Sequence, residues 1–284
     1  MILSPIIPDQ LRNAWRFLKS VSSYGNNPIQ FLKYLPTTTS PGNFQLNYEA
    51  GTSTGELPVP PSELWLGYGS NAAEYLDSGR ADVTKMLSCL SQAGWNPDSN
   101  TKPVLDLGCG GGRMIRHLEP WTKDVEVWGM DISAPHINWL KTHLCPPFNF
   151  AVNTTIPHLP FSDGYFGLIY CGSLFTHIDD LAESWFLELR RVLAPGGVIY
   201  CTLHDADTLD AIKPENPLYG VVNRRFLSNS GINVPDIVVE GADSDCNVFY
   251  GGKYIKTFLG RIFDVRLTVP RAYGYQSAWI LAHR

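Results

Sequence analysis

The sequence predicts an α/β fold in which a doubly wound, mostly parallel sheet of seven strands ends in an antiparallel C-terminal hairpin. Short apolar runs alternate with helical patterns five times between residues 71 and 204. These runs are apolar throughout, which is typical of parallel strands buried on both faces. Two further strand patterns close the chain, and the turn between them is short enough for a hairpin.

The individual elements follow from apolar spacing and from residues that begin or end helices. Strands are expected at about 103–107, 125–131, 148–152, 165–171, 198–204, 263–269 and 276–283. Helices are expected at about 71–93, 112–118, 134–143, 179–193 and 252–260. Gly94 should end the first helix, Ser133 should cap the third, and the Pro-Gly-Gly sequence at 195–197 should form a turn.

Two irregular segments flank this regular part. Eight prolines interrupt residues 1–70, where the only expected helix runs from about Asp9 to Lys19. Residues 205–250 are rich in Asp, Asn, Pro and Gly. We expect 1–70 to form an N-terminal cap and 71–284 to form the main domain, with an insertion at about 205–250. Because both segments carry many aromatic side chains and can reach the carboxyl ends of the strands, we expect them to form a lid there and to become more ordered when ligands bind.

Composition excludes several classes of protein. With 44% hydrophobic and 17% charged residues, the 284-residue chain reads as a globular, cytoplasmic protein. A net charge of −5 without a Lys/Arg cluster disfavours nucleic acid as a partner. The sequence shows neither a signal-peptide pattern nor an apolar run of ~20 residues, so we expect no contact with a membrane. The six cysteines are not spaced as metal ligands, so free thiols and no metal are expected.

The sequence VLDLGCGGG at 104–112 predicts a ligand-binding turn between a strand and a helix. A dinucleotide-binding turn would need glycine where this chain has Arg113. Asp106, just before the turn, would repel a pyrophosphate but would suit a ligand with a cationic amino group. S-adenosylmethionine carries both an ammonium and a sulfonium, so these two residues favour it over a nicotinamide dinucleotide.

Asp131 ends the second predicted strand, nineteen positions after Gly112. An acidic side chain at this place can accept hydrogen bonds from both hydroxyls of a ribose. The alternative is that the glycines serve packing alone and that Asp131 caps the next helix. The combination with the glycine turn favours the ribose.

Several segments together resemble the class I S-adenosylmethionine-dependent methyltransferases. They are VLDLGCGGGRMIRHL, WGMDIS, LPFSDGYFGLIY, LFTHI and ELRRVLAPGGVIY, within about 101–204. The last residues, YGYQSAWILAHR, resemble the closing hairpin of a bacterial branch of that family. The resemblance implies a Rossmann-like methyltransferase fold for 71–284 and S-adenosyl-L-methionine as cofactor. One departure is Gly167, where the family often has Asp.

The resemblance also implies a set of cofactor-binding residues. Asp106 and the glycines would line the methionine part, Asp131 would hold the ribose, and Ile132 would pack on the adenine. Asn153, or failing that Thr155, would meet the adenine edge. The full expected set is Asp106, Gly108, Cys109, Gly110, Gly112, Asp131, Ile132, Asn153, Thr155 and Cys171.

Candidate catalytic residues follow the fourth and fifth strands, because ligands bind beyond the carboxyl ends of such strands. His177 and His204 are there and could remove a proton from a hydroxyl acceptor. The alternative for His177 is a structural residue at a helix start. Asp205 and Asp207 nearby are interpreted as a solvated turn and not as a metal site.

The expected function is therefore S-adenosylmethionine-dependent O-methylation of a small molecule or glycan. An N-methyltransferase with the same cofactor would need no base and stays open, as does a non-catalytic protein that only binds S-adenosylmethionine. A nicotinamide oxidoreductase is disfavoured by Asp106 and Arg113. Neither the acceptor nor the oligomeric state is predicted.

Overall fold

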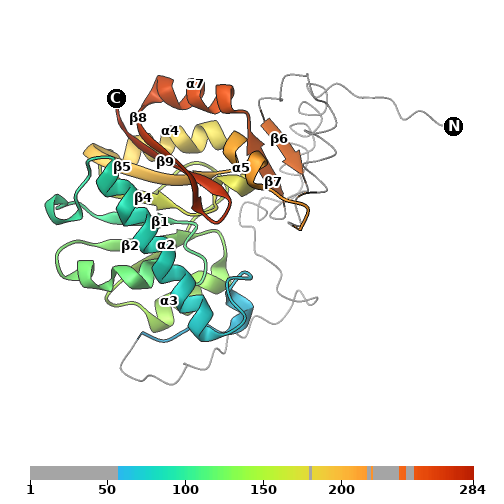
Figure 1. The fold of residues 1–284 in the computed structure, drawn as a ribbon. Helices are drawn as coiled ribbons and strands as arrows, with labels where there is room; N and C mark the ends of the chain where they lie inside the picture. Colours follow the sequence, from blue (N-terminus) through green and yellow to red (C-terminus); the bar gives the residue numbers. More distant parts are fainter. Residues whose placement is uncertain (1–56, 179–180, 216–218, 220–236, 241–245) are drawn as a thin grey trace, which may run out of the picture.

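A computed structural model describes residues 57–178, 181–215, 219, 237–240 and 246–284 (Figure 1). Its main sheet has seven strands in the order β3-β2-β1-β4-β5-β9-β8. The strands are β1 (Val104–Leu107), β2 (Val127–Asp131), β3 (Asn149–Val152), β4 (Phe166–Cys171), β5 (Leu193–Leu203), β8 (Phe263–Tyr273) and β9 (Gln276–His283). The first five are parallel, and β9 is antiparallel to both β5 and β8. The predicted fold class is confirmed.

Strand order reverses between β1 and β4, which are neighbours although two strands separate them in the sequence. At such a point the connections leave on opposite faces of the sheet and open a crevice beyond the carboxyl ends of the strands. The register aligns these ends, since Asp106 of β1 lies beside Gly129 of β2 and Tyr170 of β4. The segments that follow the five parallel strands therefore meet at one edge.

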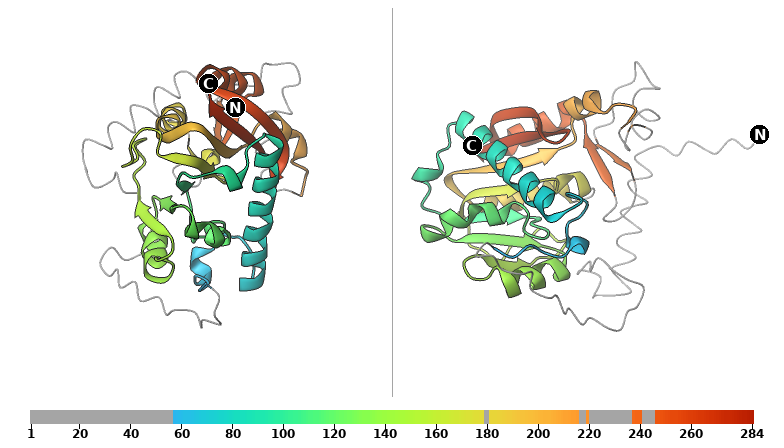
Figure 2. Two further views of the ribbon diagram at one scale, coloured as in Figure 1. Left: turned by 90° about the vertical axis from the view of Figure 1, so that its left-hand side faces the viewer. Right: turned by 60° about the horizontal axis from the view of Figure 1, so that its bottom comes forward.

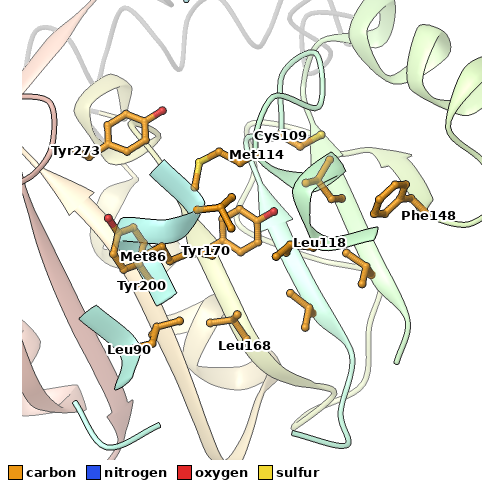
Figure 3. Packing of buried hydrophobic residues seen from close by; sticks show 14 of the residues in the cluster. Met86, Leu90, Cys109, Met114, Leu118, Phe148, Leu168, Tyr170, Tyr200 and Tyr273 are labelled. Carbon is orange, nitrogen blue, oxygen red and sulfur yellow. The ribbon is translucent and has the colours of Figure 1, made fainter. Parts of the chain in front are cut away.

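Helices cover both faces of the sheet (Figure 2). The helical elements are η2 (Ser62–Leu64), α2 (Ala72–Gln92), η3 (Pro97–Ser99), η4 (Ile115–Lys123), α3 (Ala134–His143), η5 (Phe175–His177), α4 (Ala182–Val192), α5 (Ala206–Ala211) and α7 (Gly252–Ile262). Elements α2, η4 and α3 share one core layer with the sheet, and α4 and α7 share the other. Alternate strand residues serve the two layers. Figure 3 shows Leu168 and Tyr170 of β4 in the first layer, beside Met86 of α2, and Ile169 belongs to the second.

The termini of α2 follow the sequence signals. The Asn71 side chain accepts a hydrogen bond from the backbone N–H of Glu74 at 3.0 Å, a cap that stabilises a helix by about 1 kcal/mol. Gly94 follows the end of the helix with φ of +81°. Within the described ranges, no helix is long and apolar enough to cross a bilayer.

Three local expectations were wrong. The segment expected to be helical at 112–118 is instead the 3-10 helix η4, with Pro120 inside it. The Pro-Gly-Gly sequence lies within β5, which begins at Leu193; the pairing of β5 with β4 shifts register there, and Gly196 has φ of +80°. The insertion at 205–250 contains α5 and a two-stranded sheet of β6 (Ile237–Glu240) and β7 (Asn247–Tyr250), none of which was expected.

The expected helix at about Asp9–Lys19 lies outside the described residues, as do 1–56 as a whole. The division into a cap at 1–70, a main domain and an insertion stays a prediction. All six cysteines are free thiols, and only Cys145 is exposed.

Candidate functional site

The turn after β1 requires glycine at three positions. Gly108, Gly110 and Gly112 have φ of +82°, +50° and +79°. A residue with a Cβ would pay about 1–2 kcal/mol at each left-handed position. The backbone N–H groups of Gly108 and Cys109 both donate to the Met130 carbonyl, at 2.7 and 3.1 Å, so the turn is held against the end of β2.

The Asp131 carboxylate joins this turn to the start of α3. Its Oδ2 accepts from the backbone N–H of Gly110 at 2.8 Å, and its Oδ1 accepts from the backbone N–H of Ser133 at 2.8 Å. The side chain is half-buried, so both oxygens keep acceptor capacity on the open side. This bond fixes Asp131 to Ser133, which is itself the N-cap residue of α3, so Asp131 is not the cap of that helix.

Asn153 follows β3 beside Asp131, whose carbonyl accepts its backbone N–H at 3.1 Å. The Asn153 side chain is buried, and its Nδ2 donates to the Thr154 carbonyl at 3.0 Å. Its Oδ1 has no hydrogen-bond partner among the described residues. A buried acceptor left unpaired costs about 1–3 kcal/mol, so this atom suits a ligand that donates a hydrogen bond. Thr155 uses its carbonyl to accept from the Trp185 indole at 3.3 Å.

Asp106 lies below the glycine turn with only 3% of its surface exposed. Burial raises the pKa of its carboxyl to about 8, because the ionised form loses its hydration. Burial therefore favours the neutral, protonated form of this carboxyl. A cation placed beside it would favour the ionised form, which fits a ligand with an ammonium group.

The other residues expected to bind the cofactor differ in whether their side chains are buried in the core. Cys109 and Cys171 are buried in the two core layers, so only their backbones could reach a ligand. A Cβ at Gly112 would lie 2.6 Å from Leu140 Cδ2, so packing against α3 also requires glycine there. Ile132 is half-buried directly after Asp131.

The segment after β4 is held in an unusual backbone conformation. Ser173 has φ of +59°, and its backbone N–H donates to Thr202 Oγ1 at 2.7 Å. Gln276 of β9 completes the set, since its Nε2 donates to Ser173 Oγ at 2.8 Å and its Oε1 accepts from Thr202 at 2.7 Å. Left-handed non-glycine residues of this kind are concentrated at functional sites.

His177 and His204 have opposite surroundings. His177 is exposed, and its Nδ1 lies 2.8 Å from the Cys246 carbonyl. Because a carbonyl can only accept, Nδ1 carries the proton and Nε2 is left as an acceptor. His204 is 1% exposed and stacks between Phe249 and Tyr275, with ring centroids 4.7 and 5.4 Å away. Burial lowers the His204 pKa to about 3, so its ring is neutral.

Asp205 is a buried structural cap rather than a metal ligand. Its carboxylate accepts from the backbone N–H groups of Asp207 and Thr208, the Ser277 hydroxyl and the Trp279 indole. These four donors occupy both oxygens. The residues that the structure describes contain no group of three or more His, Cys, Asp or Glu side chains able to hold a metal.

Sequence reasoning missed Leu64 and Leu66, which lie over the turn. A Cβ at Gly111 would be 2.7 Å from the Leu64 carbonyl, and a Cβ at Gly110 would be 3.1 Å from Leu66 Cδ1. Only Arg113 carried a signal, as the residue that departs from the dinucleotide pattern, and its contact with Tyr68 joins positions too far apart in the sequence to be predicted.

Comparison with known proteins supports the same interpretation. Residues 104–197 match the family model described as methyltransferase domain. The malonyl-[acyl-carrier protein] O-methyltransferase of Hahella chejuensis is 26% identical over 172 residues, 60% of this chain and 59% of the relative. These matches support a class I S-adenosylmethionine-dependent methyltransferase family for this chain. The cofactor of that family is S-adenosylmethionine.

Other relatives of this methyltransferase differ in the atom they methylate. The ajmaline N-methyltransferase of Rauvolfia serpentina is 24% identical over 145 residues, 48% of this chain and 49% of the relative. The chain spans about half the length of the curated relatives it matches. A glycopeptide N-methyltransferase in complex with S-adenosyl-L-homocysteine has the same fold, with a TM-score of 0.51 at 15% identity over 72% of this chain and 90% of that one. A protein of Pyrococcus horikoshii OT3 also shares the fold, with a TM-score of 0.50 at 21% identity over 76% and 95%.

The departure from the family at Gly167 has a packing reason. A Cβ there would lie 2.0 Å from Asn100 Oδ1, so the loop before β1 occupies the space that a side chain would need. The Gly167 N–H donates to the Pro103 carbonyl at 2.9 Å. Gly167 lies at the start of β4, whereas the candidate site lies beyond the end of this strand.

Proposed function

We propose that this methyltransferase transfers the methyl group of S-adenosylmethionine to a hydroxyl of a small molecule or glycan. The observation that carries the choice of a hydroxyl is the His177 imidazole. It is exposed at the end of η5, in the segment that follows β4, and its bond to the Cys246 carbonyl leaves Nε2 as a proton acceptor. A hydroxyl nucleophile must lose a proton, whereas a neutral amine needs no base.

The residues of the turn fit the cofactor by chemistry. Asp131 offers two carboxylate oxygens to the ribose hydroxyls, and the unpaired Asn153 Oδ1 offers an acceptor to the adenine amino group. Asp106 offers a buried carboxyl to the ammonium of the methionine part. When bound, S-adenosylmethionine supplies a methyl carbon activated by a positive sulfur.

The proposed role of His177 is to accept the hydroxyl proton at Nε2 while the Cys246 carbonyl holds the ring orientation through Nδ1. A positioned base of this kind contributes about 10²–10⁴ in rate, and alignment of the acceptor contributes more. His204 is less suited to this role, because a pKa of about 3 makes it a weak base. We assign it a packing role between Phe249 and Tyr275.

The second candidate is N-methylation, which the relationship to an N-methyltransferase supports. The two candidates separate in a methyl-transfer assay with isotope-labelled S-adenosylmethionine and pooled hydroxyl or amine acceptors. For a hydroxyl acceptor, His177→Gln should lower kcat by about 10²–10⁴. His204→Phe serves as the matched variant and should retain most of the turnover.

Retained turnover in His177→Gln with an amine acceptor would favour N-methylation. If S-adenosylhomocysteine binds but no acceptor class is methylated, the chain is a non-catalytic member of the family. Affinity for S-adenosylhomocysteine should be unchanged in both variants, since neither histidine belongs to the proposed cofactor site.

A further inference from the structure

The described part of the cap, residues 57–69, lies directly over the glycine turn. Leu64 and Leu66 cover Gly111 and Gly110, at the distances given above. His136 of α3 donates from Nε2 to the Leu64 carbonyl at 3.2 Å, while its Nδ1 accepts from the Ser133 hydroxyl at 2.6 Å. The Arg116 guanidinium donates to the Pro58 carbonyl. The cap segment is thus held by the residues that follow the turn and by those that follow Asp131.

Arg113 makes the most extensive of these contacts. Its guanidinium lies 3.9 Å from the centroid of the Tyr68 ring in the cap. It forms an ion pair with Asp82 of α2 at 2.7 Å and donates to the Tyr273 hydroxyl at the end of β8. The Tyr273 hydroxyl in turn donates to the Tyr68 hydroxyl at 2.9 Å, so that one side chain connects the cap, α2 and the C-terminal hairpin.

The environment of Arg113 favours arginine in particular. The residue is 5% exposed, so its charge is sustained by Asp82 and by the two phenol rings. A planar guanidinium can stack on an aromatic ring and donate in its own plane at the same time, which an ammonium cannot do. Gly79 of α2 lets this helix approach closely, because a Cβ there would lie 2.1 Å from the Arg113 carbonyl.

The hairpin side of this cluster reaches the segment where the methyl acceptor would bind. A Cβ at Gly172, the first residue after β4, would lie 3.1 Å from Tyr273 Cε2. Tyr273 is therefore in contact with both the cap residue Tyr68 and the end of β4. A displacement of Arg113 would therefore change the packing of Tyr68 and of Tyr273 together.

We propose that Arg113 is a positioning residue: it holds Tyr68, and with it residues 57–69, against the glycine turn, so that cap closure and cofactor binding stabilise each other. The inference depends on the proposed function, since it takes the turn as the cofactor site. Coupling between two such events is reciprocal, so the cap should become more protected when the cofactor binds and the cofactor should bind more weakly when the cap is released.

A double-mutant cycle tests this directly. The variants are Arg113→Ala, Tyr68→Ala and the double variant, with Arg80→Ala as control because Arg80 is an exposed residue of α2 whose ion-pair partner, Asp77, is also exposed. Affinity for S-adenosylhomocysteine is measured by calorimetry, and hydrogen exchange is followed in 57–69 and in 104–112 with and without this ligand. Arg113→Lys retains the charge beside Asp82 and replaces the alanine variant if that one does not fold.

Each single variant should weaken binding about fivefold or more, within the usual range of coupling between sites. The double variant should bind S-adenosylhomocysteine no more weakly than the single variant with the lower affinity. In all three variants, ligand-induced protection from hydrogen exchange should be lost in 57–69 but retained in 104–112. Additive losses would show that Arg113 does not act through Tyr68, and unchanged affinity with unchanged exchange in 57–69 would equally overturn the inference. Failure of the unaltered chain to bind S-adenosylhomocysteine would instead contradict the proposed function itself.

Discussion

At the scale of single atoms, the Asp131 carboxylate has a structural role that leaves room for a second one. Its two oxygens accept the backbone amides of Gly110 and Ser133, which sets the shape of the turn. Each carboxylate oxygen can accept a second hydrogen bond, so the same side chain remains available to a ribose. We therefore propose that this one side chain both holds the turn and binds the ribose.

We expect Asp131→Ala to weaken binding of S-adenosylhomocysteine at least tenfold. Two hydrogen bonds to a charged acceptor contribute about 1.5–3 kcal/mol each, and the turn loses its tie to α3 as well. Calorimetry measures the change, and circular dichroism confirms that the variant is folded. The affinity of Asp131→Asn, which keeps one acceptor oxygen, should lie between that of the unaltered chain and that of Asp131→Ala. An unchanged dissociation constant in Asp131→Ala would remove this residue from the site.

The buried His204 makes stability depend on pH. In the unfolded chain the ring binds a proton at its ordinary pKa of 6.5, whereas in the folded chain burial lowers the pKa to about 3. Between these values the unfolded state holds more protons, so the free energy of unfolding should fall as the pH falls below about 6.5.

Urea unfolding measured from about pH 7 to about pH 5 tests this dependence. His204→Phe removes the titrating group but keeps an aromatic ring between Phe249 and Tyr275, so its stability should fall less steeply with acid than that of the unaltered chain. Parallel curves for the two proteins would contradict the assignment of a neutral, buried His204.

At the scale of elements, a helix or strand could be predicted from the sequence wherever an apolar run alone decides the structure. The parallel strands and the closing hairpin lie within a few residues of their predicted positions, because burial on both faces requires uninterrupted apolar residues. The helix expected after the glycine turn did not form as α-helix. Instead, Gly79 lets α2 approach the Arg113 carbonyl, and the 3-10 helix η4, which contains Pro120, follows further along the chain.

Elements stabilised by distant contacts could not be predicted. Strand β7 is tied to the end of β5 by a bond from the Tyr250 N–H to the His204 carbonyl at 2.8 Å, and Cys246 at its start accepts from His177. No local pattern indicates such pairings. The same holds for the cap, where the decisive contacts join Tyr68 and Leu64 to residues some forty to two hundred positions away.

At the scale of the whole molecule, strand order explains why the candidate site could be located but not completed from the sequence. The glycine turn, Asp131, Asn153 and His177 each follow a parallel strand, and parallel strands end at one edge. Their approximate proximity therefore follows from topology. Packing between the layers decides which side chains are buried, as it does for Cys109 and Cys171. Contacts with the segment 205–250 decide which histidine keeps a ring nitrogen free to accept a proton.

Calorimetric titration of the full chain with S-adenosylhomocysteine, and separately with NAD, most directly tests whether the glycine turn serves a methyltransferase. Asp106 favours a ligand with a cationic group over a pyrophosphate, and Arg113 stands where a dinucleotide-binding turn would need glycine. The Asp131 and Asn153 acceptors fit a nucleoside. We predict saturable binding of S-adenosylhomocysteine at one site per chain and no binding of NAD. Saturable binding of NAD in the absence of any binding of S-adenosylhomocysteine would contradict this assignment.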